Sequence, residues 1–413
     1  MPTITTMMKA KAQLKVVQAL TYILPVSHPL VFVGAHSALN LCDHLQQLGL
    51  KHVFILTDKI LQRLGVIQPL HDHLLQAGLQ VTVFSDVKPD PTFEVVEQGI
   101  VQFKRAQADC VLAIGGGSTI DTSKVLVLAA ANQKSPKQLL GILKARKPAF
   151  PLFVVPTTAG TGSEVTVAAV LSDDKTHVKG LVIDPKVVPL ATALDPIIMQ
   201  GMPPNITADT GIDALTHAIE SWLSGFATQE TDHYARAATQ LILNNLILAY
   251  QEGQNIAARQ AMALGSHYAG LAMNKAAIGY VHALAHQLGA KYGIPHGRAN
   301  ALILPHVLEF NRQASAQRLG KLARDIGLTT DSNNQQATDL FIQRIKSLLA
   351  DLNISPQIEG LNPQDFPDMI EAAFKEAHGM YDVPKYMDYA DAERILLRVS
   401  ALIDFWLLRN SEA

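Results

Sequence analysis

The sequence has few cysteines, no large excess of positive or negative charge, and no long apolar run. Its 413 residues include two cysteines, Cys42 and Cys110, which are too few for a disulfide framework and lie among apolar neighbours. The formal net charge is −2, and no basic stripe or acidic tail stands out, so a nucleic-acid or membrane-surface partner is disfavoured. No apolar run reaches the roughly 18 residues of a membrane span. We therefore expect a globular protein of the cytoplasm.

The N-terminal segment superficially resembles a signal peptide. Lys9, Lys11 and Lys15 precede the apolar run VVQALTYILPV. No small-residue cleavage site follows it, and the next segment, PLVFVGAHSALN, is typical of the first strand and turn of a domain. We therefore expect no secretory processing.

The pattern between residues 31 and 185 alternates short β-branched runs with helical stretches. The candidate strands are VFVG, HVFILTD, VTVFSD, CVLAIGGG, LFVVPTT and VAAVLSD. Apolar runs of this kind, separated by helices, predict a parallel sheet that is buried on both faces. From about Pro203 the strand signal ends, and segments rich in alanine and leucine predict helices. We expect an α/β Rossmann-like domain over residues 1–198 and an all-helical domain over residues 199–413.

The first predicted strand lacks the usual dinucleotide fingerprint, because Gly34 follows it without a G-x-G-x-x-G pattern. A glycine-rich turn instead follows a later strand, in CVLAIGGGSTIDTSK at 110–124. Three glycines let the backbone approach a phosphate, and a helix that begins near Ser118 directs its amides at it. Ser118 and Asp121 could equally form an ordinary capping box.

Two further segments favour a dinucleotide. PTTAGTGSE, residues 156–164, follows another strand and offers hydroxyl groups at the carboxyl edge of the sheet, where open α/β folds bind ligands. Asp58 ends the strand VFILTD, where its carboxylate could accept hydrogen bonds from ribose hydroxyls and repel a 2′-phosphate. The alternative for Asp58 is an ordinary helix N-cap. Together the three segments predict NAD rather than NADP.

The expected helical domain contains histidines at metal-binding spacing. His282 and His286 lie four residues apart in AIGYVHALAHQLGAKYGIPHGRA, so they share a helix face. His296 follows where glycine and proline can turn the chain back. A divalent ion could collect such side chains at roughly 2.0–2.2 Å. The alternative is that His282 packs in the core and the other two lie at the surface.

A second pair upstream favours the metal site. Asp213 and His217 repeat the four-residue spacing in TADTGIDALTHAIES, and two helices with two such side chains each could hold an ion between them. Asp209 and Glu220 lie close to the same face, and spacing alone does not exclude them as ligands. Oxygen and nitrogen ligands without thiolate suit several divalent ions, so the spacing does not identify the metal.

The order and spacing of these motifs resemble the iron-containing (group III) alcohol dehydrogenases, which share a fold with dehydroquinate synthase. The resemblance extends from about residue 30 to about residue 300. It is carried by GGGS-x-x-D-x-x-K at 115–124, PTTAGTGSE at 156–164, GIDALTHAIE at 211–220, and G-x-x-H-x-x-x-H at 279–286 with the following Pro-His-Gly. The resemblance implies a Rossmann-like domain, a helical domain, an active site in the cleft between them, and a homodimer.

Matched residue by residue, the resemblance assigns roles to individual positions. It implies metal ligands at Asp213, His217, His282 and His296, with Fe²⁺ as the ion and Zn²⁺ or another divalent metal as the alternative. His286 matches a catalytic position beside the nicotinamide. Contacts to NAD fall on Asp58, Gly116, Gly117, Ser118, Asp121, Thr157, Thr158 and Lys179.

The implied activity is a metal-dependent NAD(H) oxidoreductase that interconverts a small alcohol and its aldehyde or ketone. Two alternatives stay open, namely a glycerol dehydrogenase-like enzyme that oxidises a polyol and a non-catalytic sensor of NADH and metal. A dehydroquinate synthase would need several basic residues for its phosphate-bearing substrate. The segments LTHAIESWLSG and ALAHQLGAKYG offer Lys291 but no cluster of basic residues, so we disfavour it.

Overall fold

A computed structural model describes residues 27–174 and 179–401 of the chain, so the N-terminal run considered above as a signal peptide lies outside the described residues. The chain forms two compact units. Of the described residues, the α/β unit contains 27–207 together with 251–270, and the helical unit contains 208–250 together with 271–401. The domains expected at 1–198 and 199–413 divide the chain differently, and their limits stay a prediction.

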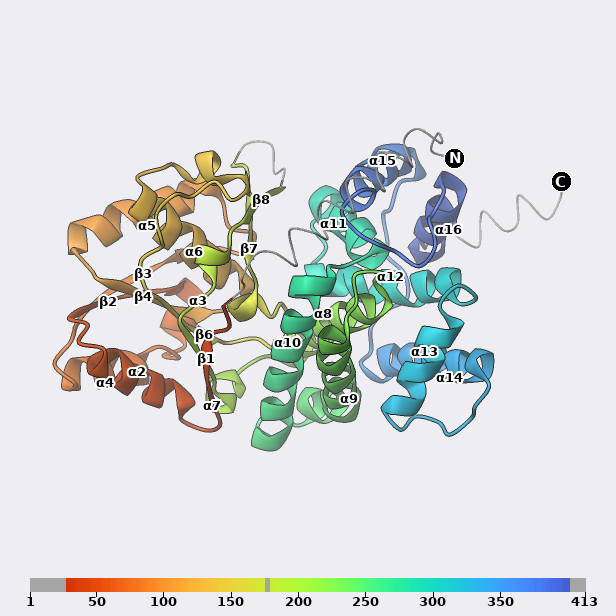
Figure 1. Ribbon diagram of the computed structural model, residues 1–413, viewed down its shortest axis with the longest axis horizontal. Helices are drawn as coiled ribbons and strands as arrows, with labels where there is room; N and C mark the ends of the chain where they lie inside the picture. The colour runs from red at the N-terminus through yellow and green to blue at the C-terminus, as the bar shows by residue number, and fades with distance from the viewer. Residues whose placement is uncertain (1–26, 175–178, 402–413) are drawn as a thin grey trace. The chain divides into compact units, whose positions relative to one another are not determined.

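The α/β unit is built on a six-stranded sheet of order β1-β9-β6-β4-β2-β3, in which every neighbouring pair is parallel (Figure 1). Its strands are β1 (Leu30–Val33), β2 (His52–Asp58), β3 (Gln80–Val87), β4 (Cys110–Gly115), β6 (Leu152–Pro156) and β9 (Ala191–Leu194). The expected α/β fold with a parallel sheet is therefore confirmed.

Both faces of this sheet are buried under helices. Along β2, Phe54 and Leu56 enter one apolar core while Val53 and Ile55 enter the other, because successive side chains point to opposite faces. The first core is shared with α5 and α6, the second with α2 and α4. These helices are α2 (Ser37–Gln47), α4 (Gln68–Gln76), α5 (Phe93–Ala106) and α6 (Gly117–Asn132), and the short α3 (Lys59–Arg63) and α7 (Pro196–Met199) complete the unit.

Four strands differ from the prediction, because one candidate belongs to another sheet and three strands were not among the candidates. The segment VAAVLSD forms β7 (Ala168–Ser172), but it pairs antiparallel with β8 (Lys179–Ile183) in a separate sheet of order β5-β8-β7, whose third strand is β5 (Gly141–Ile142). The six residues between β7 and β8 are too few for the crossover that parallel strands need. The prediction also missed β9, because its sequence ATAL is short and alanine is a weak strand former.

The helical unit confirms the predicted loss of strands after residue 203. Its longer helices run from α8 to α16, and the first part of α10 belongs to the α/β unit. Their bounds are α8 (Pro204–Leu223), α9 (Gln229–Gln251), α10 (Ile256–Ala276), α11 (Tyr280–Tyr292), α12 (His296–Asn311), α13 (Ala316–Asp325), α14 (Asn334–Asp351), α15 (Phe366–Ala377) and α16 (Tyr389–Val399). Within 27–174 and 179–401, no helix is long and apolar enough to cross a membrane.

Candidate metal centre and nucleotide-binding turn

Three helices of the helical unit bring four metal-capable side chains together. Asp213 and His217 lie one turn apart on α8, His282 lies on α11, and His296 is the first residue of α12. Each offers one ligand atom, and these four atoms all lie within 4.8 Å of one another. The Asp213 Oδ1 atom is 3.3 Å from Nε2 of His296, 3.7 Å from Nε2 of His282 and 3.9 Å from Nε2 of His217. Tetrahedral ligands at metal-bond length stand about 3.4 Å apart, so the four residues fit a divalent ion.

The four side chains differ in solvent exposure. Asp213, His217 and His282 are buried, whereas the side chain of His296 is 34% exposed. Structural metal sites are closed on all sides, while catalytic ones keep a position open for water or substrate. The exposure of the His296 side chain fits a catalytic metal site.

The charges in this cluster are strongly coupled. Burial by itself would raise the pKa of Asp213, but the rings of His217 and His296 hold it well below its usual range. Burial would lower the pKa of His282, yet the carboxylates of Glu220 and Asp213 outweigh burial and raise it to about 9. Binding of a divalent ion to these atoms therefore has to displace protons from the imidazoles.

The two acidic residues that spacing left open as ligands have other partners. Asp209 Oδ1 accepts a hydrogen bond from Nε of Arg298 at 2.7 Å. Glu220 Oε2 lies 2.6 Å from Nδ1 of His282, on the side of the ring away from the ligand atom Nε2. Neither carboxylate belongs to the four-atom group. Glu220 thus contacts one residue of the four-atom group, and Asp209 forms an ion pair beside the cluster.

Sequence reasoning missed one neighbour of the cluster, Asn300. Its side chain is buried, and its Nδ2 atom lies 2.7 Å from Oδ1 of Asp213, 3.2 Å from Nε2 of His282 and 3.3 Å from Nε2 of His296. The amide nitrogen therefore borders three of the four ligand atoms. Its position four residues after His296 on α12 repeats the spacing used to find the histidines, so the signal was present in the sequence.

His286 lies beside the cluster but outside the four-atom group. Its ring stacks against that of His296 with centroids 5.1 Å apart. Its Nδ1 atom is 2.8 Å from Oε1 of Glu376, which also accepts a hydrogen bond from the Tyr381 hydroxyl. Burial lowers the pKa of His286 to about 4 in spite of this carboxylate. The ring is therefore neutral near pH 7 and is held through Nδ1.

In the α/β unit, the glycine-rich turn leads directly from β4 into α6. The N-cap of α6 is Gly116, and no side chain caps it, so the capping box considered for Ser118 and Asp121 is not formed. Both oxygens of Asp121 instead accept other hydrogen bonds, Oδ1 from the Ser163 hydroxyl at 2.5 Å and Oδ2 from the backbone N–H of Val170 at 2.8 Å. The start of α6 is thus left without a side-chain acceptor, as an anion site at a helix N-terminus requires.

The turn packs against the segment 156–164. A Cβ atom at Gly117 would lie 2.6 Å from the Thr161 side chain, and one at Gly116 would lie 3.3 Å from that of Thr158. The backbone N–H of Thr157 donates to the Gly115 carbonyl at 3.1 Å. The absence of side chains at these glycines is therefore what allows the close approach. The structure thus brings Gly116, Gly117, Ser118, Thr157 and Thr158 together.

Asp58 and Lys179 have different positions relative to this turn. Asp58 ends β2, which is the direct neighbour of β4, so it lies at the same carboxyl edge as the turn. Its Oδ1 atom also accepts hydrogen bonds from the N–H groups of Ile60 and Leu61, at 2.8 and 2.9 Å, and caps α3. Lys179 begins β8 in the smaller sheet, with its Nζ atom 4.0 Å from Oδ1 of Asp90. The cofactor roles of both residues stay predictions.

The α/β unit has a parallel sheet with a glycine turn at its carboxyl edge, and the helical unit has an Asp-His₃ cluster. This combination is typical of a metal-dependent dehydrogenase. Two family models cover most of the chain. "Iron-containing alcohol dehydrogenase" matches residues 29–196, and "Fe-containing alcohol dehydrogenase family, C-terminal" matches residues 207–399. The chain belongs to the iron-containing alcohol dehydrogenase family. The expected family and the expected enzyme class, an alcohol-oxidising oxidoreductase, are confirmed.

Individual relatives agree with this assignment. The chain is 38% identical to the 1,3-propanediol dehydrogenase of Citrobacter freundii over 352 residues, which are 84% of this chain and 91% of that protein. It is 38% identical to the NAD-dependent methanol dehydrogenase of Bacillus methanolicus over 299 residues, 72% of this chain and 78% of that protein. Sulfoacetaldehyde reductase from Bifidobacterium kashiwanohense, solved in complex with NAD+, superposes with a TM-score of 0.84 at 28% identity, covering 92% and 99% of the two chains.

The geometry distinguishes the two aspartates on α8. Asp213→Ala removes the only anionic side chain of the four-ligand group, so we expect the Kd for Co²⁺ to rise more than the roughly 10–100-fold that loss of an outer partner costs. Asp209→Ala breaks the ion pair with Arg298 but leaves the group intact, so its Kd should change far less. Competition with a chelator measures both values. Equal losses in the two variants would contradict the choice of Asp213.

Proposed function

We propose that this protein is an Fe²⁺-dependent, NAD(H)-specific dehydrogenase of small primary alcohols and diols. The observation that carries the proposal is the convergence of four ligand atoms, from Asp213, His217, His282 and His296, within 4.8 Å at a partly exposed position. Iron is supported by the description of the matched family, and NAD by the relatives whose names include it. Short substrates are supported by the relatives named for 1,3-propanediol and methanol.

The reaction needs an ion and a nucleotide, and the residues described above support a site for each. When bound, the divalent ion supplies a Lewis acid for the substrate oxygen and the nicotinamide accepts the hydride. Asp213 gives the ligand set one formal negative charge, which does not neutralise a divalent cation. The glycines at the start of α6 leave backbone amides open to a pyrophosphate. Glu376 occupies Nδ1 of His286, which leaves Nε2 of that ring to accept or pass on a proton.

A substrate screen tests the proposal directly. The protein is purified without air, stripped with a chelator, reloaded separately with Fe²⁺ and Zn²⁺, and assayed by NADH absorbance. We expect activity to vanish on stripping, to return with Fe²⁺, and to change gradually in kcat/KM from ethanol to hexanol and 1,3-propanediol. A sharp preference for glycerol would favour the polyol alternative. Tight NADH binding without turnover of any alcohol or aldehyde would favour the sensor.

Asp58→Asn tests the cofactor preference without removing the cap of α3. Asparagine caps helices about as well as aspartate, so the two hydrogen bonds from Ile60 and Leu61 can persist while the charge is lost. Without repulsion of the 2′-phosphate, we expect the NADP+ to NAD+ ratio of kcat/KM to rise about tenfold. The thermal midpoint serves as the control and should stay constant. A wild-type enzyme that prefers NADPH would show that the role of Asp58 is wrong.

His286→Ala separates catalysis from metal binding. His286 lies outside the four-atom group, so we expect this variant to keep its metal and its NADH affinity. Proton transfer of the kind assigned to His286 typically contributes about 10²–10⁴ in rate, and kcat should fall within that range. His282→Ala and His296→Ala should lose the metal and nearly all activity. Metal content is measured together with kcat for all three variants. A metal-free His286→Ala variant with a metal-replete His282→Ala variant would show that His286 is the ligand and His282 is not.

A homodimer in the cytoplasm completes the proposal. The dimer is supported by the resemblance described above, and the cytoplasm by two cysteines that are free and buried. Sedimentation equilibrium would test the dimer, and a particle of about the 44.7 kDa chain mass would contradict it.

A further inference from the structure

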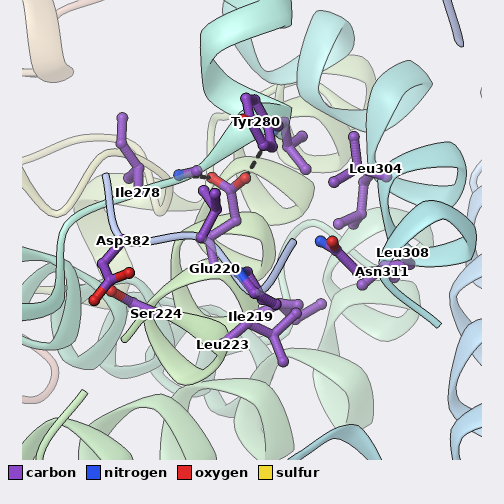
Figure 2. A pocket seen from close by; sticks show the side chains of 15 residues that line it. Ile219, Glu220, Leu223, Ser224, Ile278, Tyr280, Leu304, Leu308, Asn311 and Asp382 are labelled. Carbon is purple, nitrogen blue, oxygen red and sulfur yellow. Dashed lines mark hydrogen bonds between the residues drawn. The ribbon is translucent and has the colours of Figure 1, made fainter. Parts of the chain in front are cut away.

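Glu220 is a buried carboxylate on α8, two turns after Asp213, that none of the roles assigned so far explains. Three N–H groups at the start of α11 surround it. Oε2 accepts from the backbone of Gly279 at 2.9 Å, Oε1 accepts from the backbone of Val281 at 2.7 Å, and Oε2 lies 2.6 Å from Nδ1 of His282. Figure 2 shows the carboxylate directed at this end of α11, with apolar side chains such as Leu223 and Leu304 around it.

Two of these contacts complete the N-terminus of α11. The helix begins at Tyr280, and no side chain of its own caps Gly279. The first N–H groups of a helix have no partner within it, and leaving them buried and unsatisfied is costly. A negative charge at the positive end of the helix dipole is also favourable. A Cβ atom at Gly279 would lie 2.8 Å from Oε1 of Glu220, so this glycine is what admits the carboxylate.

The third contact acts on a ligand of the candidate metal centre. With the carboxylate at Nδ1, that nitrogen carries the proton of the neutral ring, and Nε2 keeps its lone pair. Nε2 is the atom of His282 that takes part in the four-atom group, 3.7 Å from Oδ1 of Asp213. Carboxylates that accept from the far nitrogen of a ligating histidine fix its tautomer and its orientation.

We propose that Glu220 is the positioning residue of the metal centre. One carboxylate both anchors the first turn of α11 and holds a proton on Nδ1 of His282, so the histidine is already oriented when the ion displaces the proton from Nε2. The inference rests on the proposed function, because it takes His282 as a ligand. Glu220 acts only through His282, since both of its oxygens are used at the start of α11.

Glu220→Gln tests this role because it changes the chemistry at nearly constant size. The amide oxygen can still accept from one backbone N–H, but the amide NH₂ donates toward Nδ1 of His282 and favours the tautomer that carries its proton on Nε2. We expect the Kd for Co²⁺, measured by competition with a chelator, to rise about 10–100-fold. The visible absorption of the Co²⁺-loaded protein should change as well. A merely structural role for Glu220 would lower the thermal midpoint and leave the spectrum as in wild type.

The chain offers a matched control at His286, which lies four residues after His282 on α11. Glu376 contacts Nδ1 of His286 at 2.8 Å, just as Glu220 contacts Nδ1 of His282, but His286 is outside the four-atom group. Glu376→Gln should therefore leave the Kd for Co²⁺ and the Co²⁺ spectrum unchanged. Glu220→Asp, which keeps the charge on a shorter side chain, should raise the Kd by less than the Gln variant does. If Glu220→Gln fails to fold, the Kd of Glu220→Asp for Co²⁺ still tests the proposal.

The outcomes separate this inference from the proposed function. Wild-type protein that binds no divalent ion contradicts the proposed metal centre itself. Wild-type protein that binds one ion, together with unchanged Kd and spectrum in the folded Glu220 variants, overturns the role of Glu220 alone. Equal weakening in Glu220→Gln and Glu376→Gln would also overturn it, because the effect would then not depend on His282.

Discussion

The buried carboxylate of Asp213 imposes the constraint on which the helical unit depends. A buried negative charge is costly unless positive or hydrogen-bonding groups surround it. Here the groups are the rings of His217, His282 and His296 and the amide of Asn300, and they come from three helices. Because no single helix could surround the carboxylate, α8, α11 and α12 have to meet at this point. The imidazoles that surround the carboxylate are also groups that can bind a divalent cation.

A second buried charge has the same effect in the α/β unit. Lys124 on α6 is fully buried, and its Nζ atom donates to the hydroxyls of Ser163 and Thr166, at 3.0 and 2.8 Å. Burial lowers the pKa of this lysine to about 8, against the opposing charge of Asp121. The two residues therefore tie α6 to the segment that follows β6. The helix that follows the glycine turn is thus joined to Ser163 and Thr166 through a lysine that is buried.

Much of the fold and of the candidate site could be predicted because the signals are local. Apolar runs indicated most strands of the parallel sheet, and four-residue spacings indicated the ligand-bearing helices. Local patterns did not reveal that β7 pairs antiparallel or that ATAL forms β9, since pairing depends on segments distant in sequence. The spacing of Asn300 from His296 was visible in the sequence, but its contacts with α8 and α11 were not.

The sequence by itself determined which side chains can share a helix face and where glycines let a backbone approach a ligand, because both follow from the geometry of a few consecutive residues. It could not rank Asp209, Asp213 and Glu220, since all three lie along α8 at spacings that suit one face. Only the tertiary structure decided among them. Arg298 approaches Asp209, the start of α11 approaches Glu220, and the imidazoles approach Asp213. The role of each carboxylate is set by its partners from other helices, whose positions depend on packing across the helical unit.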